Sequence, residues 1–172
     1  MRQVMKEKRK WPIVLAWWII FISLVALVAY LSFQNGEDAK ELGKQTILQF
    51  AESQNAGGVL TQEYLDMLTY KIRQSGRVIA FIVIGIVGTI TIHVSFLKSS
   101  WLTQTTITAV ILVGIACLTE WLKRYIPSRH YSYEEMRVSI FSVIIGFTVV
   151  SVATLVFKAV KGFFRLVMAG HG

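Results

Sequence analysis

The sequence predicts an all-α integral membrane protein, a bundle of about four transmembrane helices with two short external helices between the first and second spans. Two observations predict this class. Hydrophobic residues make up 54% of the 172 residues and charged residues only 16%, against about 25% charged in a typical soluble domain. The apolar residues also gather in blocks of about 20, which suffice to cross roughly 30 Å of hydrocarbon. At this length we expect residues 1–172 to form a single transmembrane domain.

The first predicted span covers residues 12–33, and we expect it to be a retained anchor. Pro12 suits the first turn of a helix, where the N–H that proline lacks would have no partner. Tryptophans favour the membrane interface, and three lie near the basic start of this run: Trp11, Trp17 and Trp18. A secretory signal peptide is the alternative. The run is longer than a usual signal core and lacks the small residues of a cleavage site, which favours the anchor.

Residues 34–76 form the only substantial polar segment and are predicted to lie outside the membrane. A first short helix is expected around residues 39–51, and the glycines of residues 55–58 separate it from a second. Thr61 is a candidate cap for that second helix. Its apolar residues recur every fourth position, at Leu60, Tyr64, Leu68 and Ile72. We therefore expect a pair of surface helices that lie on the membrane or over the bundle.

The remaining three spans are predicted at about 78–97, 101–122 and 138–157. Gly85 and Gly88 lie within the second, where small residues let neighbouring helices approach closely. A polar hairpin, residues 123–137, joins the third span to the fourth. The single cysteine, Cys117, cannot form an internal disulfide and is interpreted as a packing residue.

The net charge of +8 bears on orientation more than on nucleic acid. Five basic residues directly precede the first span, where they hold the amino terminus in the cytoplasm and contact anionic lipid heads; we expect no nucleic-acid partner. With both termini inside, the cytoplasmic and external pieces each carry nine Lys and Arg, so the first span decides the orientation. Basic residues on the outer face then need another explanation, and binding of something anionic is one.

Arg73 and Arg77 lie four residues apart on one helix face, at the mouth of the second span. Two interpretations are open. Arginine side chains at helix ends often extend to the interface, with no further role. Alternatively the pair clamps an anion, because the guanidinium fork fits phosphate and carboxylate.

Glu120 borders the hydrocarbon near the end of the third span, where a charge is costly unless it is paired or hydrated. It is either the ion-pair partner of Arg73 or Arg129, or a catalytic base. Glu134 and Glu135 begin the fourth helix, where negative charge suits the helix dipole.

His93 lies deep in the second span, where an ionisable group is a functional hypothesis by default. It also lies close to the inner interface, beside Ser95 and Lys98, which favours an interfacial role. The sequence contains no metal-ligand spacing, Ser–His–Asp set or glycine-rich phosphate loop. We therefore expect neither a metal nor a cofactor.

Three stretches of the sequence resemble motifs of the VanZ-like family, small bacterial membrane proteins named for teicoplanin resistance. After the first span, the chain reads Ser32-Phe33-Gln34-Asn35-Gly36, similar to Ser-x-Gln-x-Gly. From Arg73 to Gly85 it resembles the family run Arg-Lys-x-Ala-His-Phe-x-Glu-Tyr-x-x-Leu-Gly. Glu120 and the following Tyr125-Ile126-Pro127-Ser128-Arg129 are similar to Asp-Glu-x-x-Gln and Phe-x-Pro-Gly-Arg. The spacing continues through Glu135, Ser139, Ser142 and Gly146.

Carried over by position, the retained polar residues of the motifs are Arg73, Glu120 and Arg129, with Glu135 in place of an aspartate. Other positions depart from the pattern. Where the family tends to have His and Glu in the second span, this chain has Arg77 and Ala80, and where it has Gln and Asn, this chain has Lys123 and Ser139. The loss of His and Glu leaves no evident proton carrier there, which points to binding without catalysis.

The resemblance implies an envelope function in a Gram-positive bacterium, with reduced susceptibility to lipophilic glycopeptides such as teicoplanin. We expect Arg73, Glu120 and Arg129 to converge near the outer leaflet, because each lies at the external end of a span. The expected partners are membrane lipids and an anionic envelope lipid or glycopeptide, held by the arginines while Glu120 orients Arg129.

Three other classes remain open. One is an enzyme acting on an envelope lipid with Glu120 as general base. Another is a small transporter or channel, for which a homo-oligomer would supply the missing half. The third is an accessory subunit of a larger membrane assembly.

Overall fold

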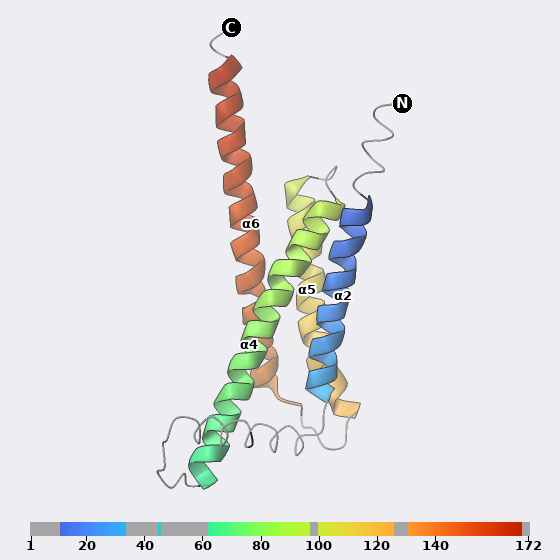
Figure 1. Ribbon diagram of the computed structural model, residues 1–172, viewed down its shortest axis with the longest axis vertical. Coiled ribbons are helices and arrows are strands. Elements are labelled where there is room, and N and C mark those ends of the chain that lie inside the picture. Colours follow the sequence, from blue (N-terminus) through green and yellow to red (C-terminus); the bar gives the residue numbers. More distant parts are fainter. Residues whose placement is uncertain (1–10, 34–44, 46–61, 97–99, 126–130, 170–172) are drawn as a thin grey trace.

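Residues 11–33, 45, 62–96, 100–125 and 131–169 are described in the computed structural model, and all their regular structure is helical. The described elements are α2 (Trp11–Phe33), α4 (Gln62–Ser95), α5 (Trp101–Leu122), the short 3-10 helix η1 (Lys123–Tyr125) and α6 (Tyr133–Ala169). Figure 1 shows α2 and α5 running in the opposite direction to α4 and α6.

Four of these helices are long and apolar enough to cross a membrane, which indicates a multi-pass membrane protein. The predicted all-α class is therefore confirmed. The third predicted span, 101–122, coincides with α5, and the first, 12–33, differs from α2 by one residue. The first expected external helix lies outside the described residues except for Gln45, which is helical.

Helix α4 begins earlier than the predicted span. The second expected external helix and the second span are one continuous helix, because the chain from Gln62 to Ser95 holds no proline and only Gly76 interrupts the polar part. A single glycine costs a helix about 1 kcal/mol relative to alanine, too little to end it. With 34 residues, α4 is about 50 Å long, so its first turns extend beyond a hydrocarbon core of roughly 30 Å.

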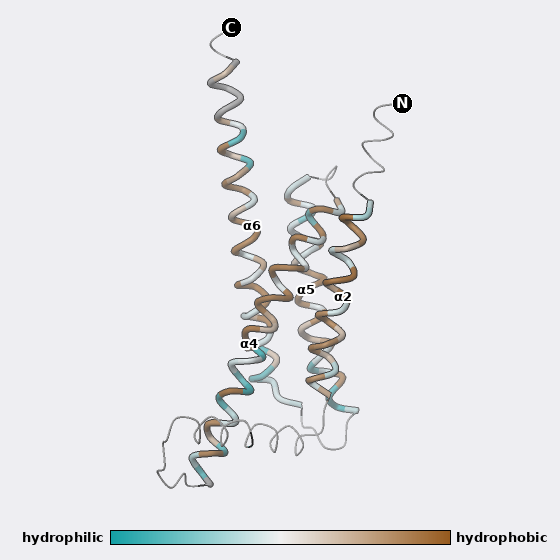
Figure 2. Tube along the Cα trace, viewed as in Figure 1, coloured by the Kyte–Doolittle hydropathy of each residue, from teal (hydrophilic) through white to brown (hydrophobic). Residues whose placement is uncertain are grey.

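The core forms where α4 packs against each of the other three long helices. Phe21 of α2, Ile84 of α4, Leu112 of α5 and Val143 of α6 are all buried within it. Two polar contacts add to the α2–α4 packing: Trp18 Nε1 donates to Ser95 Oγ at 3.0 Å, and the Thr91 hydroxyl approaches the carbonyl of Trp17 at 3.4 Å. Figure 2 shows hydrophobic residues along the middle of the bundle and hydrophilic residues at the start of α4.

Helices α4 and α6 cross at two glycines, Gly85 and Gly146. A Cβ atom at Gly85 would lie 2.5 Å from the carbonyl oxygen of Val143, and one at Gly146 would collide with the carbonyl of Ile82. The backbones therefore approach more closely than any side chain allows, as small residues permit in membrane helices. Beyond this crossing the two helices diverge (Figure 1).

Candidate functional site

Four elements bring charged side chains together at the end of the bundle where α4 starts, α5 ends and α6 starts. Arg77 comes from α4, Glu120 from the last turn of α5, Lys123 from η1 and Glu135 from the first turn of α6. We call these four residues the charge cluster.

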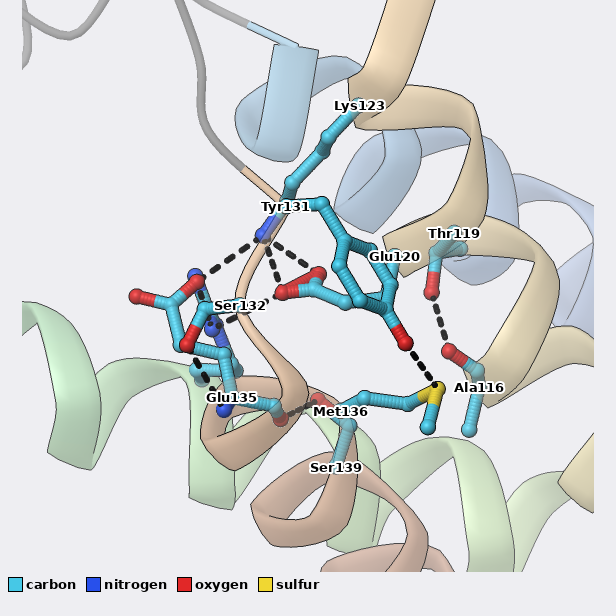
Figure 3. Close-up of polar contacts among 10 residues, drawn as sticks. Ala116, Thr119, Glu120, Lys123, Tyr131, Ser132, Glu135, Met136 and Ser139 are labelled. Atoms are coloured by element: carbon cyan, nitrogen blue, oxygen red, sulfur yellow. Dashed lines mark hydrogen bonds and ion pairs between the residues drawn. The ribbon is translucent and has the colours of Figure 1, made fainter.

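Lys123 occupies the middle of the charge cluster. The 3-10 turn that follows α5 directs its side chain back into the protein, where the residue is only 1% exposed. Its ammonium donates to Glu120 Oε1 at 2.7 Å and to Glu135 Oε2 at 3.1 Å. Figure 3 shows the Lys123 side chain reaching between the two carboxylates. One lysine thus links the end of α5 to the start of α6.

Arg77 supplies the second cation. Its Nη1 lies 2.5 Å from Glu135 Oε2 and 3.5 Å from Glu120 Oε1. Both carboxylates therefore share both cations, and the charge cluster is electrically balanced. Such balance is required inside the protein, because a buried charge is tolerated only when it is paired and hydrogen-bonded.

The local sequence around Glu135 fixes its position. Ser132 precedes α6, and its hydroxyl accepts from the Glu135 backbone N–H at 3.4 Å, as an N-cap residue does. A Ser followed by Glu three residues later usually forms a capping box. Here the carboxylate of Glu135 pairs with Lys123 and Arg77 instead.

A groove of about 370 Å³ lies beside the charge cluster, between the first half of α4 and the start of α6. Its lining combines charged, aromatic and aliphatic side chains: Tyr70, Gln74, Arg77, Glu134, Glu135, Arg137, Val138 and Phe141. Tyr70 is 55% exposed and Phe141 61%. The groove is therefore a charged surface bordered by accessible aromatic rings.

The structure places the predicted site residues as follows. Arg77, Glu120 and Glu135 lie together. Arg73 is half-buried one turn before Arg77 and forms no ion pair with another described residue. Arg129 lies outside the described residues. The partners expected for Glu120 were Arg73 and Arg129; the cations at Glu120 in the described part of the chain are Lys123 and Arg77.

Lys123 is the member of the charge cluster that sequence reasoning missed, since its position in the sequence suggests a hairpin loop. One signal was present, its position three residues after Glu120, a spacing that brings helical side chains together.

His93 lies on α4 about four turns from Arg77 and is only 9% exposed. Neither ring nitrogen has a hydrogen-bond partner among the described residues. It is separate from the charge cluster. Within the described ranges, no group of three or more His, Cys, Asp or Glu residues could hold a metal ion.

The contacts of Glu120 limit what the charge cluster can do. Oε1 faces both Lys123 and Arg77, and Oε2 lies 2.5 Å from Lys123. A general base must reach the proton that it abstracts, whereas both oxygens of Glu120 already face cations inside the protein. The arrangement is therefore suited to holding three helices and positioning charge at the groove.

Comparison with known proteins found no matching family model, and no characterised protein or solved structure matches significantly. The resemblance to the VanZ-like family therefore stays a prediction from the three motifs.

Proposed function

We propose that this membrane protein binds an amphiphilic lipid of the cell envelope in the groove between α4 and α6. One observation carries the proposal: the groove places Arg77 and Arg137 beside the exposed rings of Tyr70 and Phe141. Arginine suits the phosphate or carboxylate of a headgroup. The apolar lining suits an acyl chain, since ligand sites combine an apolar wall with a few placed polar groups.

Binding is favoured over catalysis because both carboxylate oxygens of Glu120 face cations inside the protein. Two charged groove side chains are exposed at its mouth and form no ion pair with another described residue: Glu134 and Arg137, whose guanidinium lies 5.8 Å from the centre of the Tyr133 ring. Exposed charges at a groove can meet a ligand without disturbing the protein, whereas disengaging a buried pair is costly.

The envelope role rests on the sequence. We propose a VanZ-like protein with both termini in the cytoplasm, so that the groove opens at the outer face, where a lipid-linked wall precursor or the acyl chain of teicoplanin is accessible. The start of α2 and the end of α6 lie at the end of the bundle opposite the charge cluster (Figure 1), as this orientation requires.

Lipid retention tests the proposal. The purified protein would be mixed with envelope phospholipid in detergent, and bound lipid counted by native mass spectrometry. Arg137→Gln removes an exposed cation of the groove. Arg124→Gln is the matched control, because Arg124 is also exposed near this end of the bundle but does not line the groove. We expect Arg137→Gln to lower lipid retention and Arg124→Gln to leave it unchanged. Equal retention by both variants would reject the groove as the site.

The glycopeptide role is tested in cells. A sensitive Gram-positive host would carry empty vector, the wild-type chain, Arg137→Gln or Arg124→Gln at matched membrane expression. Teicoplanin protection by the wild type and Arg124→Gln, lost in Arg137→Gln, is the expected result. No protection by a well-expressed wild type would remove glycopeptide resistance while leaving lipid binding to its own test.

A further inference from the structure

Two helix faces line the groove, each with regular spacing. On α4 the lining residues are Tyr70, Gln74 and Arg77, at helical positions i, i+4 and i+7. On α6, Glu134 and Phe141 lie seven residues apart with Arg137 between them. Residues at these intervals share one side of a helix, so each helix presents a single stripe to the groove.

The two stripes run in the same direction along the groove, because α4 and α6 are parallel (Figure 1). Arg77 is level with Glu135, as their 2.5 Å contact shows. Tyr70 lies about 10 Å farther toward the start of α4, and Phe141 lies about 9 Å deeper along α6 than Glu135. From outside to inside, the order is Tyr70, then Glu134 nearly level with Arg77 and Glu135, then Arg137 about 3 Å deeper, then Val138 and Phe141.

The charges of the groove are balanced. Among its described lining residues, Arg77 is paired with Glu135, which leaves Arg137 and Glu134 to face a headgroup. A headgroup with only negative charge would gain from Arg137 but face the carboxylate of Glu134. A headgroup with phosphate and ammonium satisfies both signs, because phosphate suits arginine and an ammonium suits both a carboxylate and the face of a tyrosine ring.

We infer that the lipid of this groove has a zwitterionic headgroup, with its phosphate at Arg137 and its ammonium farther out, at Glu134. The order of groups matches such a lipid, whose ammonium lies outermost and whose acyl chains lie innermost, along Val138 and Phe141. The inference rests on the proposed function and narrows it to one lipid class.

Headgroup competition tests the inference. The purified full chain would be mixed with equal amounts of phosphatidylethanolamine and phosphatidylglycerol of identical acyl chains, and both bound species counted by native mass spectrometry. We expect the ethanolamine lipid to exceed the glycerol lipid about tenfold. Glu134→Gln should reduce that ratio toward one, and Glu134→Lys should invert it. The matched control is Glu63→Gln, because Glu63 is exposed on α4 and does not line the groove.

Three outcomes separate the two claims. An ethanolamine preference that Glu134→Gln removes and Glu63→Gln keeps supports the inference. A glycerol preference, or none, with retention that still depends on Arg137 overturns the inference and leaves the proposed function standing. Retention that is independent of Arg137 overturns both. Circular dichroism and a monodisperse elution peak for each variant ensure that a lost preference is not lost folding.

Discussion

The ammonium of Lys123 lies 2.7 Å from Oε1 of Glu120, on its own side of the hairpin, and 3.1 Å from Oε2 of Glu135, on the other side. The contact with Glu120 joins residues three positions apart in the chain. The contact with Glu135 joins residues twelve positions apart, which the fold brings together. Arg77 then extends the same charge cluster to α4. Ion pairs thus hold the helices together at the end of the bundle that carries the groove. In the middle of the bundle, apolar packing and the close approach at Gly85 and Gly146 hold them together.

Removing Lys123 should destabilise the protein strongly. Lys123→Met would leave two carboxylates with Arg77 alone, and breaking a buried pair typically costs about 3–5 kcal/mol. The measurement is the free energy of unfolding in mixed micelles. Arg124→Met is the neighbouring control. Arg124 is exposed, and its guanidinium lies 4.9 Å from the centre of the Tyr131 ring, a contact worth about 0.5–1 kcal/mol, so this variant should change the free energy of unfolding by no more than about 1 kcal/mol.

Restoring charge balance should recover part of this loss. The double variant Glu120→Gln with Lys123→Met again has one cation, Arg77, and one carboxylate, Glu135, in contact. A buried pair replaced as a unit is often nearly neutral. We therefore expect the double variant to unfold with a higher free energy than Lys123→Met. If the two losses simply add, Lys123 and Glu120 do not interact as described.

The crossing of α4 and α6 should not tolerate a side chain at either glycine. Gly146→Ala places a methyl group against the carbonyl of Ile82, and overpacking of this kind costs about 1–3 kcal/mol. Gly162→Ala is the control, since a Cβ there meets nothing within 4 Å and alanine favours the helix. Unfolding free energies should fall for the first variant and hold or rise for the second. The opposite ranking would contradict the crossing.

Replacing His93 by leucine should leave stability unchanged or raise it. The ring is nearly buried, and neither nitrogen has a hydrogen-bond partner among the described residues. An apolar side chain of similar size therefore removes two buried polar atoms whose hydrogen bonds are not made. Ile92→Ala, at a fully buried neighbour, is the positive control and should cost about 2–5 kcal/mol. A loss for His93→Leu as large as for Ile92→Ala would show that His93 has a polar partner.

The sequence predicted the spans well where composition changes sharply. Helix α5 begins after Ser100, whose hydroxyl caps it, and ends at the charged turn of Lys123. The predicted start of the second span, residue 78, is not the start of a helix, because the polarity of α4 changes there while its helix continues. Polarity reports the position of the membrane boundary, and helix continuity depends on backbone preference, which Gly76 alone does not overcome.

Only part of the charge cluster could be predicted from the sequence. Arg77 and Glu120 were chosen for their position at the end of a span, and Glu135 through the motif resemblance, but the contacts among the three were not predicted. The contact between Arg77 and Glu135 joins residues far apart in the chain, and it depends on the parallel crossing that the two glycines set. The contact between Lys123 and Glu135 depends on the turn after α5. Neither follows from residue spacing.

Photo-crosslinking from within the groove tests whether a lipid binds there. A photoreactive phenylalanine analogue would replace Phe141 in the groove or Val110 on α5, two exposed apolar positions of which only the first lines the groove. In native membranes, we expect the analogue in place of Phe141 to capture one phospholipid in preference to the bulk composition, and we expect Arg137→Gln to abolish this enrichment. Crosslinks at Phe141 that match those at Val110 and the bulk membrane would contradict a lipid-binding groove.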